Sequence, residues 1–181
     1  MNFKVTKSET IFNGRVFDVQ VDELEYDSGN KGIREVVLHN GGSVVLPVTD
    51  DGKIVMITQY RYPFGKFMLE LPAGKLEKGE APQYCAEREL TEETGYSSDN
   101  FTKLGTIATT PGFCSELLHI YLAENLKAGE HNREEGEYGM EVFEFTLDEI
   151  DEKIMNGEIF DSKTICGINY YKTLIERRKK G

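Results

Sequence analysis

The sequence predicts an α/β fold in which a mixed sheet is packed between helices as an α/β/α sandwich, with a small antiparallel β sheet at the N-terminus. Two observations lead to this fold class. Short apolar runs of strand length recur along the chain and are bounded by Gly, Asn or Asp turn residues. Three segments with helical signals, at 80–95, 146–157 and 165–175, are interleaved with these runs. An interleaved order of strands and helices is typical of a sheet that helices cover.

The N-terminal region, residues 1–40, predicts a separate small sheet. Alternating residues predict strands at 10–12, 15–21 and 33–38. Asn13-Gly14 is a hairpin signal between the first two strands, and a polar cluster over 27–32 marks the next turn. Three short strands are marginal alone, so this sheet is expected to pack on its own domain or on a partner chain.

Residues 41–181 are expected to form the main domain. Its predicted strands lie at 43–48, 53–59, 67–71, 104–109, 117–122 and 140–145. Thr146 and Glu149 form a capping box that starts the first C-terminal helix, and Gly157 ends it. The last helix carries apolar residues at helical spacing and ends in four basic residues, which suit the C-terminal end of the helix dipole.

The helix predicted over 80–95 carries the most specific signal. Pro82 suits its first turn and Gly95 suits its end. Three carboxylates stand at positions i, i+3 and i+4 and so project from one face, those of Glu89, Glu92 and Glu93. Arg88 lies among them as a partner that can orient them. Such a face is either solvated acidic surface or a site for a hard cation, Mg²⁺ or Mn²⁺, which prefers oxygen ligands.

Composition restricts the classes of function. The net charge of −11 argues against binding to nucleic acid or to an anionic membrane. Three cysteines without metal-ligand spacing predict reduced thiols. No signal-peptide core and no stretch of transmembrane length is present. These features predict a soluble, cytoplasmic protein.

The stretch from Gly74 to Tyr96 resembles the Nudix box, Gly-x5-Glu-x7-Arg-Glu-U-x-Glu-Glu-x-Gly-U, in which U is apolar. All seven fixed residues match, namely Gly74, Glu80, Arg88, Glu89, Glu92, Glu93 and Gly95. Tyr96 in the last apolar position is the one soft match. The chain is similar to this family from Ser43 to about Tyr171, and the resemblance implies the same α/β/α sandwich.

The resemblance implies that the helix of the box binds divalent metal ions, Mg²⁺ or alternatively Mn²⁺, that bridge a diphosphate. By position, Glu89 and Glu93 are the implied main ligands and Glu92 a supporting one, and the carbonyl of Ala73 completes the set. Glu80 and Arg88 more often hold the loop and the helix of the box together, and Arg88 is included in the expected catalytic site. Bound metal also explains how an acidic protein binds an anionic substrate.

Two features outside the box resemble the branch that hydrolyses ADP-ribose and nucleotide sugars. The first is Gln59-Tyr60-Arg61-Tyr62 followed by Glu-Leu-Pro-Ala-Gly at 70–74, which implies that Arg61 contacts phosphate. The second is Pro111, which lies sixteen residues after Gly95 and is followed by Glu116, where relatives carry an acid. The alternatives are that Arg61 is an exposed loop cation and that Pro111 is an ordinary turn residue.

The catalytic base of this branch comes from a late loop. The stretch 136–142, Gly-Glu-Tyr-Gly-Met-Glu-Val, resembles the relatives' pattern with one extra residue. Glu137 is therefore the first candidate for the base and Glu141 the second. Glu134 and Glu135 are the candidates of lower rank. Each of these residues could alternatively be a loop charge that serves solubility.

In relatives of this kind the N-terminal strands form a swapped homodimer, and side chains of both subunits surround the adenine. Phe12, Phe17, Arg34 and Glu35 are the matching residues here, although Phe17 could equally pack in a core. The resemblance implies Mg²⁺-dependent hydrolysis of ADP-ribose to AMP and ribose 5-phosphate. The alternatives are a pyrophosphatase for other nucleoside diphosphate sugars, such as ADP-glucose or GDP-mannose, and a module that senses a nucleotide without cleaving it.

Overall fold

The structure is a computed structural model that describes residues 2–130 and 139–181. The chain divides into two compact units. The N-terminal unit comprises Met1–Gly41 together with Ala108–Leu117, and the core unit comprises Gly42–Ile107 together with Leu118–Gly181. The predicted boundary near residue 40 did not include the segment 108–117, which belongs with the N-terminal strands.

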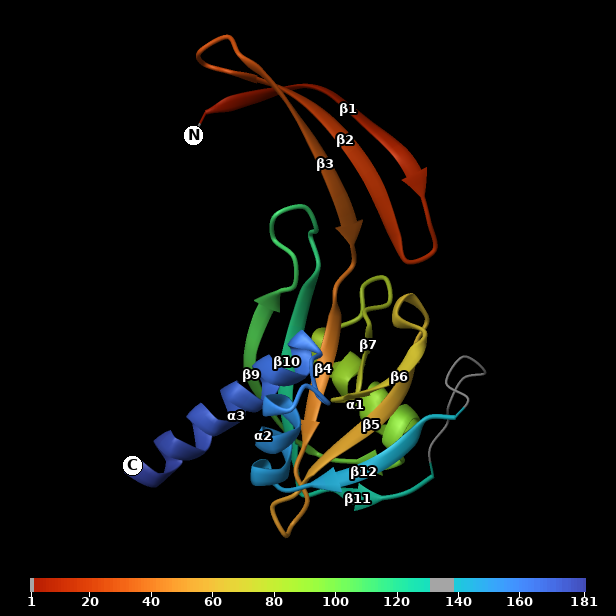
Figure 1. Cartoon of the computed structure of the whole chain (residues 1–181), viewed down its shortest axis with the longest axis vertical. Helices are drawn as coiled ribbons and strands as arrows, with labels where there is room; N and C mark the ends of the chain where they lie inside the picture. The colour runs from red at the N-terminus through yellow and green to blue at the C-terminus, as the bar shows by residue number, and fades with distance from the viewer. Residues whose placement is uncertain (1, 131–138) are drawn as a thin grey trace. The chain divides into compact units, whose positions relative to one another are not determined.

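The N-terminal unit is an antiparallel sheet of β1 (Phe3–Asn13), β2 (Phe17–Tyr26) and β3 (Lys31–His39), in the order β1-β2-β3 (Figure 1). The segment 108–117 adds to β3, because Val37 N donates to Phe113 O at 2.7 Å and Ser115 N donates to Val37 O at 2.9 Å. Among the residues of the three strands, Leu24 alone is buried. The predicted N-terminal antiparallel sheet is therefore confirmed, with longer strands than expected.

The core unit contains a mixed sheet with the order β7-β4-β10-β9. Its strands are β7 (Ala73–Lys75), β4 (Gly42–Pro47), β10 (Leu117–Glu124) and β9 (Asn100–Ala108). The sheet is mixed because β4 pairs in parallel with β10 and antiparallel with β7. An antiparallel sheet has the order β12-β5-β6, from β12 (Glu141–Phe145), β5 (Ile54–Arg61) and β6 (Lys66–Glu70). A short pair is formed by β8 (Tyr96–Ser97) and β11 (Lys127–Ala128).

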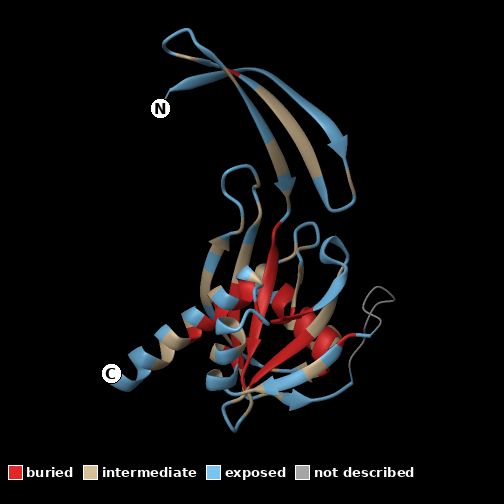
Figure 2. Cartoon of the chain, viewed as in Figure 1, coloured by how far each residue is buried: buried red, intermediate tan, exposed pale blue. Residues whose placement is uncertain are grey.

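Alternation along β4 and β10 separates two apolar clusters on opposite faces of the mixed sheet. Val44 and Leu46 of β4 pack with the cluster that holds α2 (Leu147–Met155) and α3 (Ser162–Lys180). Val45, between them, packs with the cluster that holds α1 (Pro82–Thr94). Figure 2 shows these central strands and α1 as largely buried. The sheet is thus covered by α1 on one face and by α2 and α3 on the other, which confirms the predicted sandwich.

The helix ends follow the predicted signals. In α1, Pro82 occupies the first turn and Gly95 ends the helix at φ 78°. In α2, the hydroxyl of Thr146 accepts from Glu149 N at 3.3 Å, and Thr146 N donates to Glu149 Oε2 at 2.8 Å. The last helix begins at Ser162, earlier than its apolar pattern indicated, because the side chain of Asp161 caps it. Within the described residues, no helix is long and apolar enough to cross a membrane.

Candidate functional site

The acidic face of α1 lies against the strand that precedes the helix in the chain. Glu89 and Glu93 are both buried, and Glu93 Oε2 accepts a hydrogen bond from Ala73 N at 2.9 Å. A Cβ atom at Gly74 would lie 1.7 Å from Glu89 Oε1, so the close approach of the carboxylate requires glycine there. The structure therefore brings together Ala73, Glu89 and Glu93, which the box pattern had selected as metal ligands.

Arg88 holds three of the carboxylates of the box. Its guanidinium donates to Glu80 Oε1 at 3.0 Å, to Glu89 Oε1 at 2.6 Å and to Glu92 Oε2 at 2.8 Å. Burial lowers the pKa of Arg88, but the hydrogen bonds to Glu80 and the charge of Glu89 outweigh it and raise that pKa overall. Burial raises the pKa of Glu80, but the hydrogen bonds from Arg88 and from the backbone of Glu77, together with the charge of Arg88, outweigh it and lower that pKa. Arg88 thus offsets the mutual repulsion of the acidic face.

The donor atoms on this face suit a hard divalent cation. Glu80, Glu89, Glu92 and Glu93 offer only oxygen atoms, the ligands that Mg²⁺ prefers. These four carboxylates outnumber the guanidinium of Arg88, which pairs with three of them, so the excess of negative charge favours a cation. In the part of the chain that the structure describes, no three His, Cys, Asp or Glu side chains converge as a ligand set. Glu80, Glu89 and Glu92 are instead oriented toward Arg88, whereas Glu93 accepts from the backbone of Ala73.

Arg61 lies at the end of β5, where β5 pairs with β6. Its guanidinium forms a bidentate ion pair with Glu70, in which Nε lies 2.8 Å from Oε1 and Nη2 lies 2.6 Å from Oε2. The side chain of Arg61 is 36% exposed, whereas that of Glu70 is 1% exposed. Hydrogen bonds to Glu70 raise the pKa of Arg61, and the negative charge of Glu93 adds to the effect. Arg61 is therefore a strand residue with a fixed guanidinium, not a loose loop cation.

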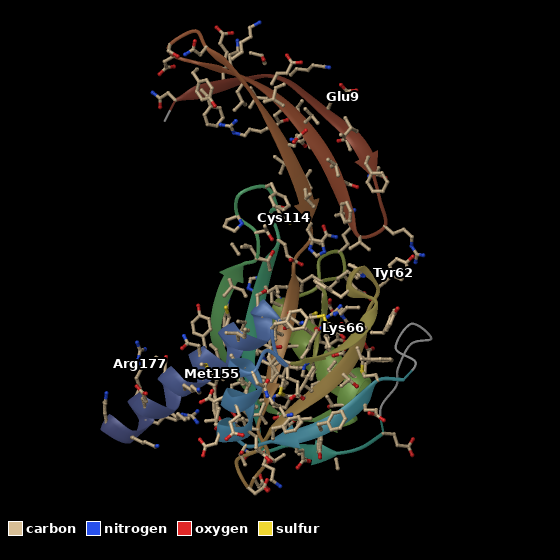
Figure 3. All side chains as sticks on the ribbon, in the orientation of Figure 1. Glu9, Tyr62, Lys66, Cys114, Met155 and Arg177 are labelled. Atoms are coloured by element: carbon tan, nitrogen blue, oxygen red, sulfur yellow. The ribbon has the colours of Figure 1, made fainter. Side chains whose placement is uncertain are left out.

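The turn after Arg61 exposes aromatic side chains. It contains the 3₁₀ helix Tyr62–Phe64, and Figure 3 labels Tyr62, the first residue of this helix, and Lys66, the first residue of β6. Tyr62 is 87% exposed, and Lys66 Nζ lies 4.3 Å from the ring centre of Phe160. The predicted strands stopped at 59 and resumed at 67, but β5 and β6 continue to Arg61 and from Lys66 and form a regular hairpin around this short helix.

The expected adenine contacts lie in the N-terminal unit. Phe17 is exposed and lies 5.8 Å from the ring of Phe12, so it does not pack in a core. Arg34 is exposed and donates to the hydroxyl of Tyr26 at 2.7 Å. Glu35 is also exposed, on β3 opposite Val21. Phe12, Phe17, Arg34 and Glu35 are therefore all accessible on the N-terminal unit.

Pro111 and Glu116 also belong to the N-terminal unit, in the segment that adds to β3. Pro111 is exposed within a turn in which Phe113 N donates to Thr110 O. Glu116 Oε2 accepts from the hydroxyl of Thr109 at 2.7 Å, and Glu116 Oε1 lies 3.3 Å from His39 Nδ1. The hydroxyl of Thr109 therefore holds this carboxylate, whereas His39 Nδ1 accepts from Gly41 N at 2.9 Å and donates no hydrogen bond to it.

The NUDIX domain family profile matches residues 39–166 of this chain. The chain belongs to the Nudix family. Its curated relatives include an "ADP-ribose pyrophosphatase" of Bacillus subtilis, 45% identical over 92% of this chain and 91% of the relative. A "Methanol dehydrogenase activator" of Bacillus methanolicus is 44% identical over the same shares. A "GDP-mannose pyrophosphatase" of Escherichia coli is 34% identical over 74% of each chain.

A solved structure described as "ADP compounds hydrolase" has the same fold as this Nudix chain. Its TM-score is 0.88, and the match covers 98% of this chain and 96% of the other. The two sequences are 19% identical, so this likeness concerns the fold alone.

Of the candidates for a catalytic base, Glu134, Glu135 and Glu137 lie outside the described residues. Glu141 is described, and it is exposed at the start of β12 with its backbone N donating to the hydroxyl of Thr58 at 3.2 Å. Its exposure leaves its carboxylate accessible.

Sequence analysis missed a buried polar cluster in this Nudix fold, formed by Glu70, Lys163 and Thr164 with Asp161. The one available signal was an Asp-Ser-Lys-Thr stretch at the start of the last helix, where Asp161 could have been recognised as a cap. Nothing in the spacing indicated that Lys163 turns inward to meet Glu70 of a different element.

Proposed function

We propose that this chain hydrolyses the diphosphate of ADP-ribose to AMP and ribose 5-phosphate, and that the reaction requires Mg²⁺. The observation that carries the proposal is the pair of buried carboxylates on α1, those of Glu89 and Glu93. Glu89 lies so close to the backbone of Gly74 that a side chain at that position would meet it. The relatives named as ADP-ribose pyrophosphatases, from Bacillus subtilis at 45% identity and from Mycobacterium tuberculosis at 34%, support the choice of substrate.

Glu89 and Glu93, with Glu92 in support and the carbonyl of Ala73, would hold the metal. Mn²⁺ has the same preference for oxygen and is the alternative ion. A metal held by these residues would supply a lowered pKa for the attacking water and would offset the charge of the diphosphate. Arg61 binds phosphate oxygens with the exposed side of its guanidinium. The water oxygen forms a bond to one phosphorus, and the bond from that phosphorus to the bridging oxygen breaks.

The proton of the attacking water is taken by a Glu of the late loop, and Glu137 is the first candidate and Glu141 the second. A positioned general base contributes about 10²- to 10⁴-fold to the rate. We therefore expect Glu137→Gln to lower kcat by about 100-fold or more with little change in Mg²⁺ dependence. Glu141→Gln is the matched comparison. Near-full kcat in Glu137→Gln together with a large loss in Glu141→Gln would move the base to Glu141.

We propose further that the protein is a cytoplasmic homodimer in which the region 1–40 supplies the contact and residues 41–181 the hydrolase domain. The sheet of the N-terminal unit supports this, because large apolar side chains are exposed on it, among them Phe3, Val5, Ile11, Phe12, Phe17 and Ile33. Analytical ultracentrifugation of the purified chain measures the association, and a monomer at micromolar concentration contradicts it.

Hydrolysis of a nucleotide panel tests the proposed activity. ADP-ribose, ADP-glucose, GDP-mannose, a diadenosine compound and NADH are each supplied with Mg²⁺ or with chelator, and phosphatase releases phosphate from the products. We expect ADP-ribose to be cleaved fastest, and cleavage to stop in chelator. A lead for GDP-mannose or ADP-glucose keeps the chemistry and replaces the substrate. No turnover of any compound contradicts the proposal.

A further inference from the structure

Lys163 is a buried lysine in the first turn of α3. Its side chain is 9% exposed, and its ammonium contacts Glu70 and lies 2.9 Å from Asp161 Oδ2. Lysine is rarely buried unless it is paired, because its charge loses the solvation of water. The chain therefore bears a free-energy cost to place this cation inside the core unit, and the roles assigned so far to the site do not use it.

Glu70 joins this lysine to Arg61. Its two oxygens accept both hydrogen bonds of the Arg61 fork, and one of them, Oε2, also contacts Lys163. The pair fixes the plane of the guanidinium, because a fork with two bonds has little rotational freedom. Lys163, Glu70 and Arg61 thus form a row of ion pairs. Glu70 is almost wholly buried and Arg61 is partly exposed, so the guanidinium of Arg61 is the part of this row that reaches solvent.

Lys163, the buried member of this row of ion pairs, lies where side-chain hydrogen bonds fix the start of α3. Asp161 Oδ2 accepts from the backbone N of Thr164 at 3.0 Å and from its hydroxyl at 2.6 Å. The Thr164 hydroxyl oxygen in turn accepts from Leu71 N at 2.9 Å. Leu71 directly follows Glu70, so the helix start holds both the carboxylate and the backbone next to it.

The charges of this cluster balance. Arg61 and Lys163 are cations, and Glu70 and Asp161 are carboxylates. Burial raises the pKa of Asp161, but the charge of Lys163 and the hydrogen bonds from Thr164 and Lys163 together outweigh it and lower that pKa, which keeps Asp161 ionised. Without Lys163, two carboxylates would face one guanidinium, and the attraction of Arg61 for an anion would be reduced.

We propose that Lys163 is a positioning residue for the diphosphate site. Through Glu70 it fixes the guanidinium of Arg61, and by sharing the charge of Glu70 it keeps the positive charge of Arg61 available to the substrate. This inference rests on the proposed function, in which Arg61 contacts phosphate. Its rival is that Lys163 only stabilises the attachment of α3.

A double-mutant cycle separates these two roles. The variants are Lys163→Met, Arg61→Met and the double variant, and kcat and KM are measured for ADP-ribose at saturating Mg²⁺ together with thermal unfolding. Lys172→Met is the matched control, because Lys172 lies on the same helix and pairs with Asp151 of α2 outside the cluster. If Lys163→Met does not fold, Lys163→Gln, which retains a hydrogen-bond donor without the charge, takes its place.

We expect Lys163→Met to raise KM by about tenfold, as partners behind a ligand-binding residue commonly do, with a smaller change in kcat. In the Arg61→Met background the same substitution should raise KM less than twofold. Lys172→Met should leave KM unchanged. An equal fold-change in both backgrounds, or a loss of thermal stability with unchanged KM, overturns the proposal.

The wild-type assay keeps this test separate from the proposed function. If the wild type cleaves another diphosphate of the panel, the function is revised and the same cycle is run on that substrate. If it cleaves none, the proposed function fails, and calorimetric binding of ADP-ribose to the four proteins of the cycle replaces KM. Equal dissociation constants for the wild type and Lys163→Met then overturn the inference independently.

Discussion

Glu93→Gln is expected to lower kcat by more than about 100-fold, because it removes the charge of a proposed main metal ligand. Mutation of a residue that only hydrogen-bonds to a metal ligand commonly lowers metal affinity or activity by about 10- to 100-fold, so loss of a ligand should cost more. The fold should survive. Glu93 is 1% exposed and accepts from Ala73 N, and the Gln carbonyl oxygen can accept the same hydrogen bond. Removing one of several neighbouring negative charges also leaves the free energy of unfolding unchanged or slightly higher.

Steady-state kinetics over a range of Mg²⁺ concentrations, with urea unfolding of the same preparations, measures both parts. Glu87→Gln is the matched control, since Glu87 lies on the same helix and its carboxylate accepts from Gln83 away from the acidic face. Near-wild-type kcat in Glu93→Gln, with Mg²⁺ dependence unchanged, would show that the ligands of the metal lie elsewhere.

Arg88→Met is expected to produce the largest loss of stability, about 2 kcal/mol at pH 7. Loss of one partner of a buried ion pair commonly costs 3–5 kcal/mol, and we reduce that figure because the Arg88 side chain is 23% exposed. The substitution leaves Glu80, Glu89 and Glu92 without the cation that now bridges them.

The loss should depend on pH in a defined direction. The pKa of Glu80 is lowered from its ordinary value of 4.5 in the folded protein, so its pairing stabilises the fold above that value. This contribution disappears as the pH falls through the folded-state pKa. The difference between wild type and Arg88→Met should therefore be full above about pH 5 and should shrink at lower pH.

Urea unfolding between pH 3 and pH 7 measures this difference. Arg178→Met is the control, because Arg178 also forms a two-pronged pair, with Glu124, but on the surface, where such pairs contribute about 0–1 kcal/mol. A destabilisation of Arg88→Met that equals that of Arg178→Met, or that does not change with pH, contradicts this account of the acidic face.

The parts of the fold that the sequence could predict are those set by neighbours along the chain. Pro82, Gly95 and the Thr146 capping box act within one or two turns, and the observed helices agree with them. The acidic face follows from helical spacing alone, so Glu89, Glu92 and Glu93 could be placed together without knowledge of the sheet. The strands of the mixed sheet could be located, because their apolar runs are short and bounded by turns.

The parts that could not be predicted depend on contacts between distant segments. Lys163 meets Glu70 across 93 residues, and no local pattern distinguishes this lysine from one on a solvated helix. The predicted strand ended at residue 59, before Arg61, because the aromatic turn that follows gave no sign of the continuing pairing between β5 and β6. The orientation of the carboxylates toward Arg88 was also unpredictable in detail, since spacing specifies a face but not the rotamers on it.

The addition of the segment 108–117 to β3 affects the order in which the newly made chain can fold. His39 N bonds to the hydroxyl of Ser115, a partner 76 residues later, and β4 likewise pairs in parallel with β10. During synthesis, β3 and β4 therefore leave the ribosome long before their partners exist. Contacts of such long sequence separation slow folding, and they leave strand edges open in the meantime. The edge of β5 likewise stays open until β12, residues 141–145, has been made, so the nascent chain is exposed to misassembly with other chains through most of its synthesis.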